Sequence, residues 1–150
     1  MAQAIQLPSL GMARPTHREE EPNRRQWSPV KSMESPVWLR EAYDRISALA
    51  ALKNNWDTYG GLPVASRAIL GARVLLSNLD LEGFPKPHLA PIPDGGIGLH
   101  WRILGRDLEI EVEASGVVRY LKTHVGGEST DGEVRSLQDA QEALNWVLGT

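Results

Sequence analysis

The chain has 150 residues, of which 41% are hydrophobic and 23% charged, and these values are typical of one globular domain rather than a fibre or a wholly disordered chain. It contains no cysteine, which excludes cysteine nucleophiles, thiolate metal sites and disulfide bonds. Its net charge of −3 provides no global positive field that would draw it to nucleic acid or to an anionic membrane. It has no run of 18 apolar residues, and its first residues lack the basic segment and the sustained apolar stretch of a signal peptide. We therefore expect a cytoplasmic protein.

Residues 1–35 are expected to form a disordered tail, because proline, arginine and glutamate occur there with scattered apolar residues in no regular period. Within it, Arg24, Arg25 and Trp27 make a short basic and aromatic element. Such an element can dock on a partner protein or stack on single-stranded nucleic acid, and it can equally be a solvated segment with an incidental tryptophan. We expect nucleic-acid binding, if any, only through this tail.

Residues 36–150 are expected to form a single domain that opens with two helices. Ser35 and Pro36 are typical of a helix start, and this helix is expected to run to about Lys53. The second helix is expected from about residues 63–66 to Leu79. Each carries one apolar stripe, formed by Leu39, Tyr43, Ile46 and Ala50 in the first helix and by Ala65, Ile69, Ala72, Leu76 and Leu79 in the second. Gly71 costs the second helix about 1 kcal/mol relative to alanine, so a close approach to a neighbouring element is expected there.

Strands are predicted next. Four prolines restrict residues 88–92 to an extended segment at a sheet edge, since proline cannot donate to a central ladder. Residues 97–103 and 107–113 alternate apolar and polar side chains, as half-buried strands do.

The strand register follows from the turns. A two-residue Gly105-Arg106 turn would pair Ile103 with Leu108, Trp101 with Ile110 and Leu99 with Val112 on the apolar face. On the other face it would pair Arg102 with Glu109 and His100 with Glu111. A three-residue loop, 114–116, would place Val118 and Tyr120 beside Val112 and Ile110, and Arg119 beside Glu111. The outer face is then a ladder of charges.

A polar loop is expected at residues 124–133, followed by a third helix. Ser136 is its predicted N-cap, with Asp139 three residues further on, and Gly149 is its predicted end. The pattern predicts an α+β two-layer sandwich, in which three helices cover one face of an antiparallel meander of three to four strands. The expected order is helix, helix, four strands, helix.

Two motifs stand out: Asn-Trp-Asp-Thr-Tyr-Gly-Gly at residues 55–61 and Asp-Gly-Gly-Ile-Gly-Leu-His-Trp at residues 94–101. With them the chain resembles a group of small, uncharacterised bacterial proteins. That group carries a Trp-Asp-x-Tyr-Gly element between two helices, an Asp-Gly-Gly-Ile-x-Leu-x-Trp strand and a strand ending in Leu-Glu-Ile-x-Val. The resemblance covers residues 45–121, departs at Gly61 where alanine is expected, and implies an α+β domain from a bacterium or phage. It implies no catalytic role.

Asp57, Tyr59, Asp94 and His100 are weak catalytic candidates, with Asp or His as a general base and Tyr as a donor. The competing interpretation is that both aspartates shape glycine-containing turns and that Trp56 and Trp101 fill the core. The row of His100, Glu111 and Arg119 is interpreted either as a catalytic trio or half of a metal site on the sheet, or more simply as a ladder of cross-strand ion pairs. No metal site or cofactor is predicted, because neither paired histidines nor a phosphate-binding motif occurs.

The absence of catalytic motifs favours a non-enzymatic protein-interaction module, for example an accessory, antitoxin-like or inhibitor partner in a bacterial or phage system. Its expected contact residues are Arg24, Arg25 and Trp27 in the tail and the acidic row Glu109, Glu111 and Glu113, which suits a basic partner protein. The alternative is a small hydrolase or nuclease that uses Asp57, Asp94 and His100.

Overall fold

The fold is that of a computed structural model, which describes residues 35–150. The chain divides into two units between Met33 and Glu34. The predicted tail therefore lies, except for Ser35, outside the described residues.

The domain is an α+β fold, as predicted, with a five-stranded sheet whose strands follow one another in chain order and pair antiparallel with their neighbours. The strands are β1 His88–Pro91, β2 Ile97–Ile103, β3 Arg106–Val112, β4 Val118–His124 and β5 Ser129–Glu133. The helices are α2 Leu39–Ala50, α3 Ser66–Asn78 and α4 Leu137–Leu148. The sheet thus has one strand more than the expected three to four.

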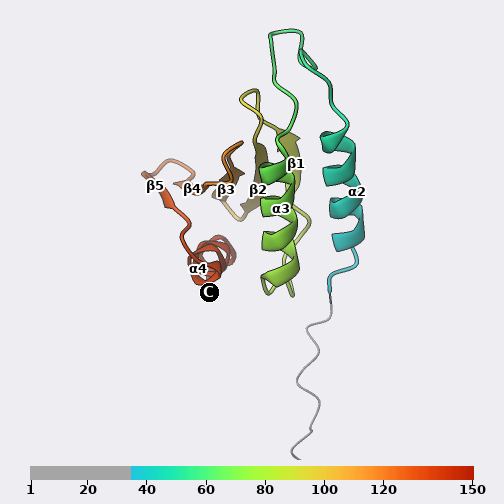
Figure 1. The fold of residues 1–150 in the computed structure, drawn as a ribbon. Coiled ribbons are helices and arrows are strands. Elements are labelled where there is room, and N and C mark those ends of the chain that lie inside the picture. Colours follow the sequence, from blue (N-terminus) through green and yellow to red (C-terminus); the bar gives the residue numbers. More distant parts are fainter. Residues whose placement is uncertain (1–34) are drawn as a thin grey trace, which may run out of the picture. The chain divides into compact units, whose positions relative to one another are not determined.

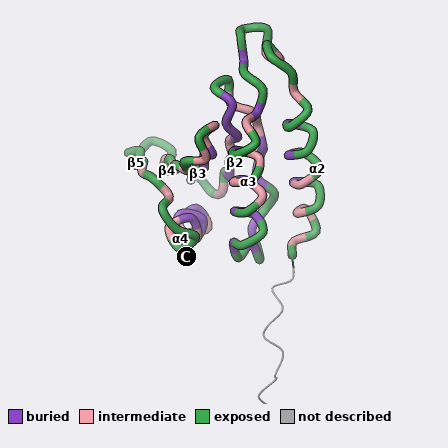
Figure 2. Tube along the Cα trace, in the orientation of Figure 1, coloured by how far each residue is buried: buried purple, intermediate pink, exposed green. Residues whose placement is uncertain are grey.

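The core lies between the sheet and the helices. Helices α3 and α4 pack on the inner face of the central strands, and α2 packs beside α3 and against β1 (Figure 1). Alternate residues of β2 and β3 are buried on that face: Ile97, Leu99, Trp101, Leu108, Ile110 and Val112. Figure 2 shows the buried positions on the facing sides of sheet and helices. Each fully buried large apolar side chain stabilises the fold by about 1.5–3 kcal/mol.

Helix α2 is shorter than expected at both ends. The predicted cap, Ser35, is not its N-cap; Trp38 is, and the backbone N–H of Leu39 bonds to the Pro36 carbonyl at 3.0 Å in a preceding turn. The Trp38 indole donates to the Phe84 carbonyl at 2.8 Å, so this tertiary contact holds the residue where the helix starts. At the other end, Ala51 bonds back to Ala48, a tight final turn that ends the helix at Ala50 rather than near Lys53.

Helix α3 agrees with the prediction, and so does the close approach at Gly71. A Cβ atom added to Gly71 would lie 2.7 Å from Cγ1 of Val112, a buried residue of β3. The glycine therefore lets the helix lie close to the sheet, which offsets its low helix propensity.

The predicted register of β2 and β3 is wrong by two residues. The turn consists of Leu104 and Gly105, both with positive φ (46° and 80°), which is the pattern of a type I′ hairpin. Ile103 therefore pairs with Arg106, and the apolar pairs are Ile97–Val112, Leu99–Ile110 and Trp101–Leu108. On the outer face, His100 lies opposite Glu109 rather than Glu111, and Arg102 opposite Asp107 rather than Glu109. A shift of two residues leaves every side chain on its predicted face.

The next hairpin has the predicted register, with Val112 opposite Val118, Ile110 opposite Tyr120 and Glu111 opposite Arg119. The polar segment expected as a loop, however, contains β5, which pairs with β4 from Thr123–Ser129 to Arg119–Glu133. Its side chains are largely exposed. Because neither face of β5 is buried, its sequence lacks the alternation that marks a strand.

The termini of α4 are those predicted. The Ser136 hydroxyl accepts the Asp139 N–H at 3.1 Å, and the Asp139 carboxylate accepts the Arg135 N–H at 2.9 Å. Gly149 ends the helix with φ 86°. Local capping chemistry therefore defines this helix.

Candidate protein-interaction surface

The connection between α2 and α3, which carries the first motif, is a loop closed by its own hydrogen bonds. The Asn55 N–H donates to the Gly61 carbonyl, and the Asn55 side chain accepts the Gly60 N–H, both at 2.7 Å. The Trp56 indole donates to the Leu62 carbonyl at 2.8 Å. Trp56 is half-buried and stabilises the loop through this bond, rather than filling the core. Trp101 is buried in the core as expected.

Asp57 has a structural role in this loop. Its Oδ1 accepts the N–H of Tyr59 at 2.9 Å and that of Gly61 at 2.7 Å. These hydrogen bonds, that of Tyr59 first, hold the pKa of the Asp57 carboxyl below its usual value. Tyr59, by contrast, is 92% exposed. The geometry is that of a turn acceptor, with the tyrosine directed to solvent.

Asp94 lies in the turn between β1 and β2, where its Oδ1 accepts the Gly96 N–H at 3.1 Å. The two motifs meet here through their backbones, because Leu62 donates to the Pro93 carbonyl at 2.8 Å and Ala65 to the Gly95 carbonyl at 2.9 Å. Gly95 has φ 99° and lies against Pro63, which explains the glycine at this position. The motifs therefore dock α3 onto the β1–β2 hairpin.

His100 does not lie beside Asp94. It lies three residues along β2 from Ile97, about 10 Å at the usual rise of a strand, and Asp94 lies beyond that end of the strand. Its Nε2 is 3.3 Å from Oδ1 of Asp107, which also accepts Nε of Arg102 at 2.6 Å. The hydrogen bond from the Arg102 guanidinium lowers the pKa of the Asp107 carboxyl, and this effect outweighs partial burial, which acts in the opposite direction. The trio of Arg102, Asp107 and His100 is a cross-strand ion-pair cluster.

The outer face of the sheet, opposite the helices, carries the predicted acidic row. We use the name acidic face for Asp94, Glu109, Glu111 and Glu113. Burial raises the pKa of Glu111, and the neighbouring Asp94, Glu113 and Glu109 raise it further, while Arg119 acts in the opposite direction. Three carboxylates thus act on that of Glu111, which is half-buried.

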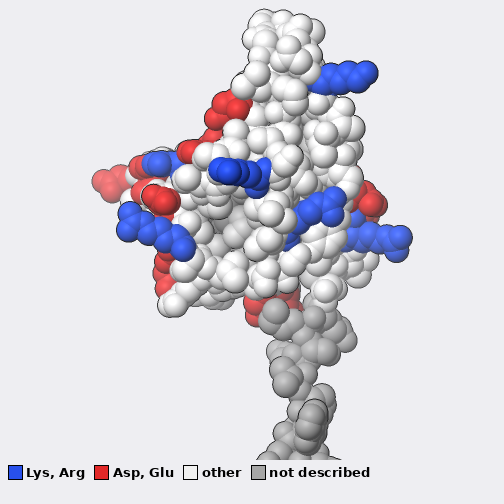
Figure 3. Space-filling model, viewed as in Figure 1, with Lys and Arg blue, Asp and Glu red and all other residues white. Residues whose placement is uncertain are grey.

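A shallow cavity of about 280 Å³ adjoins the acidic face, lined by Glu109, Glu111, Arg119, Tyr120, Leu121 and Asp131. Arg119 pairs with Asp131 of β5 at 3.7 Å rather than directly with Glu111 opposite it. In the view of Figure 3, charged side chains of both signs gather at the side where β5 lies, and the connection between α2 and α3 is mostly uncharged.

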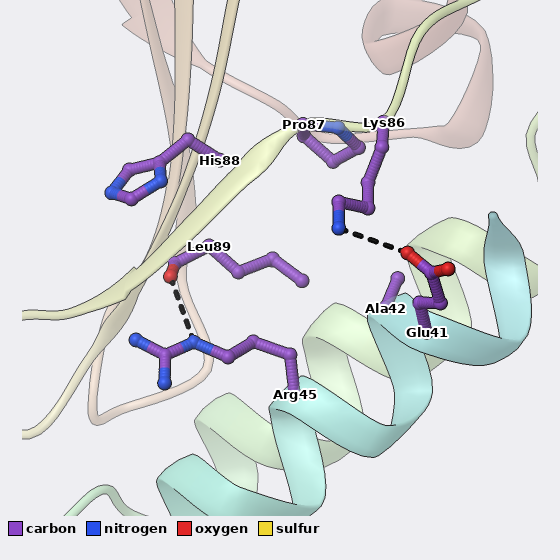
Figure 4. Close-up of a pocket in the computed structure, with 7 residues that line it drawn as sticks. All are labelled: Glu41, Ala42, Arg45, Lys86, Pro87, His88 and Leu89. Carbon is purple, nitrogen blue, oxygen red and sulfur yellow. Dashed lines mark hydrogen bonds and ion pairs between the residues drawn. The ribbon is translucent and has the colours of Figure 1, made fainter.

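Sequence reasoning missed a groove between α2 and β1 (Figure 4). It has a volume of about 400 Å³ and is lined by Glu41, Ala42, Arg45, Lys86, Pro87, His88 and Leu89. Lys86 pairs with Glu41 at 3.0 Å, and Nε of Arg45 donates to the Leu89 carbonyl at 3.3 Å. In the sequence, the only features that relate to this groove are the charged residues of α2 and the proline-rich segment before β1. Both features are too common to predict a groove.

Among residues 35–150, no group of three or more histidine, aspartate or glutamate side chains is arranged to hold a metal ion. The other predicted contact residues, Arg24, Arg25 and Trp27, lie outside this range. No helix in the described part of the chain is long and apolar enough to cross a membrane.

Comparisons with models of protein families, with curated proteins and with solved structures find no match to this chain.

Proposed function

We propose that the protein is a non-enzymatic interaction module that binds a basic partner protein through its acidic face. An accessory, antitoxin-like or inhibitor role would each use such a surface. The proposal places the protein in the cytoplasm, in keeping with a chain that has no cysteine.

The observation that carries this proposal is the crowding of four carboxylates on the sheet face that the described helices leave open. Burial raises the pKa of Glu111 most, the neighbouring Asp94, Glu113 and Glu109 raise it further, and this repulsion is unfavourable in the free protein. A partner that brings cationic side chains relieves this repulsion. Complementary charge of this kind contributes mainly to association rate and to specificity.

The alternative of a hydrolase or nuclease has less support. Asp57 and Asp94 each use Oδ1 to hold the backbone of their own turn, and His100 lies along β2 away from Asp94 and pairs with Asp107 instead. A general base needs partners that converge with it on the reacting group, and Asp94 and His100 do not converge.

The test is affinity capture of the tagged full-length protein from its native host, followed by mass spectrometry. We compare the wild type with Glu109→Gln/Glu113→Gln. The matched control is Asp44→Asn/Asp80→Asn, which removes the same charge from two exposed positions, one on α2 and one just after α3. A stoichiometric basic protein retained by the control and lost by the acidic-face variant supports the proposal. Equal capture by both variants, or no stoichiometric partner for the wild type, contradicts it.

A parallel capture with a chain that lacks residues 1–34 tests the predicted role of Arg24, Arg25 and Trp27. If the tail contributes to the contact, the shortened chain loses the same partner.

A further inference from the structure

The two edges of the sheet differ in the backbone groups that they present. At β1, the Ile92 N–H bonds to the Gly96 carbonyl, so alternate residues from Ile92 face β2, and Pro87, Leu89 and Pro91 face away from it. The two prolines have no N–H group, and the Leu89 carbonyl accepts the Arg45 side chain (Figure 4). This edge is therefore closed to another strand.

The edge at β5 is open. The Val134 N–H bonds to the Val118 carbonyl, so Gly132 and Thr130 face β4, and Ser129, Asp131 and Glu133 direct their N–H and C=O groups away from the sheet. Within residues 35–150, these outward backbone groups have no hydrogen-bond partner. The strand contains no proline, and all its residues except Gly132 are exposed. It thus offers a template for a further strand.

We infer that an extended segment of a partner protein, with basic residues at alternate positions, adds to β5 as a sixth strand. This inference rests on the proposed function and identifies how the basic partner is held. Backbone hydrogen bonds to β5 supply the register, and the alternate basic side chains lie on the outer face beside Asp131 and Glu133.

Charge decides between this occupant and a second copy of the chain. Two antiparallel copies of β5 centred on Asp131 would place that carboxylate opposite itself, which is unfavourable for like charges in a cross-strand pair. Asp131 is 71% exposed and pairs with Arg119 at 3.7 Å through Oδ2, and Glu133 pairs with Arg135 at 3.9 Å through Oε2, so the second oxygen of each carboxylate is left outside these ion pairs. Both carboxylates therefore remain open to the cations of a partner.

The inner side of the same edge accommodates the remaining side chains of such a segment. A hollow of about 410 Å³ lies beside β5, lined by Tyr120, Lys122, Glu133, Arg135, Asp139 and Glu142. The Tyr120 ring lies against Gly132, and a Cβ atom at residue 132 would come within 2.8 Å of the tyrosine Oη. The glycine is therefore needed at this position. A side chain of moderate size next to Gly132 packs against this ring.

The test uses ¹⁵N-labelled full-length protein and two synthetic peptides of equal composition. One alternates lysine or arginine with valine over eight residues, and the other carries the same residues as a basic block followed by a valine block. We expect the alternating peptide to slow amide hydrogen exchange of Asp131 and Glu133 at least tenfold, and the block peptide to leave it unchanged.

The matched variants separate backbone pairing from charge. Asp131→Pro removes an outward N–H without touching the ladder to β4 and is expected to weaken binding of the alternating peptide at least tenfold. Asp131→Asn keeps the backbone N–H and removes only the charge, so it is expected to weaken binding of the alternating peptide only a few-fold. Glu133→Pro repeats the first test at a second outward position, in case Asp131→Pro does not fold.

Equal protection by both peptides, or full binding by a folded proline variant, overturns strand addition. Absence of binding by the alternating peptide at millimolar concentration, or a stable dimer in sedimentation, also overturns it. The proposed function is decided separately, because capture that depends on Glu109 and Glu113 but not on the proline variants leaves it standing.

Discussion

The carboxylate of Asp57 holds the connection between α2 and α3 by accepting two backbone N–H groups. Asp57→Ala is therefore expected to lower the melting temperature at pH 7, whereas Asp57→Asn, which retains an acceptor oxygen, is expected to have a smaller effect. Thermal melts followed by circular dichroism measure both. Equal losses for the two variants would show that charge, rather than hydrogen-bond acceptance, matters at this position.

The pH dependence of this contribution has a definite sign. Because the folded-state pKa of Asp57 lies below its ordinary value of 3.8, its stabilising contribution is present above that pH and is lost as the pH falls through the lower folded-state value. The difference between wild type and Asp57→Ala is therefore expected to shrink only at pH values below 3.8.

Glu111 shows the opposite dependence. Burial and three neighbouring carboxylates raise its folded-state pKa above 4.5, so the stability associated with its protonated form is present below that value and is lost as the pH rises through the folded-state value. We expect Glu111→Gln to increase the free energy of unfolding at pH 7 by up to about 1 kcal/mol, with little difference below pH 4.5. Urea denaturation between pH 4 and pH 8 measures this, and Asp44→Asn serves as the control. A Glu111→Gln variant less stable than wild type at pH 7 would indicate that its attraction to Arg119 dominates.

At the scale of the elements, the β2–β3 turn determines the pairing of the acidic face. Leu104 is 96% exposed and has φ 46°, a conformation that costs a residue with a Cβ atom about 1–2 kcal/mol and that asparagine tolerates better. We expect Leu104→Asn to increase the free energy of unfolding by about 0.5–1 kcal/mol, with Leu104→Ala close to wild type. A shift of the urea midpoint at unchanged m-value would verify this. Destabilisation by Leu104→Asn would mean that the leucine contributes packing that its exposure does not indicate.

The elements also show which patterns predict well. The α4 helix could be predicted because Ser136, Asp139 and Gly149 are local signals that act whatever surrounds them. The start of α2 could not, since the Trp38 contact with Phe84 joins residues 46 positions apart. The β5 strand was missed because its exposed residues form a strand only by pairing with β4.

At the scale of the whole described domain, Gly71 sets how closely α3 lies to the sheet. Gly71→Ala would normally favour a helix, but the added Cβ would lie 2.7 Å from Val112, so we expect a net loss of about 1–2 kcal/mol in the free energy of unfolding. In a Val112→Ala background the same change is expected to be neutral or stabilising, because the contacting methyl group is gone. Urea denaturation of the four proteins in this double-mutant cycle measures the coupling, and additive effects would contradict the contact.

The sequence by itself determined the α+β class, the inner and outer faces of β2 and β3, the β3–β4 register and the limits of α4. These depend on side-chain alternation, loop length and capping, which are properties of neighbouring residues. The candidate site was predictable only in part, since the outward direction of Glu109 and Glu111 follows from alternation. Only the tertiary structure decided which residues lie opposite them, because the alternation fits a turn at Leu104-Gly105 as well as one at Gly105-Arg106. It alone separated His100 from Asp94 and left β5 as an open edge, because both outcomes depend on pairing between segments distant in sequence.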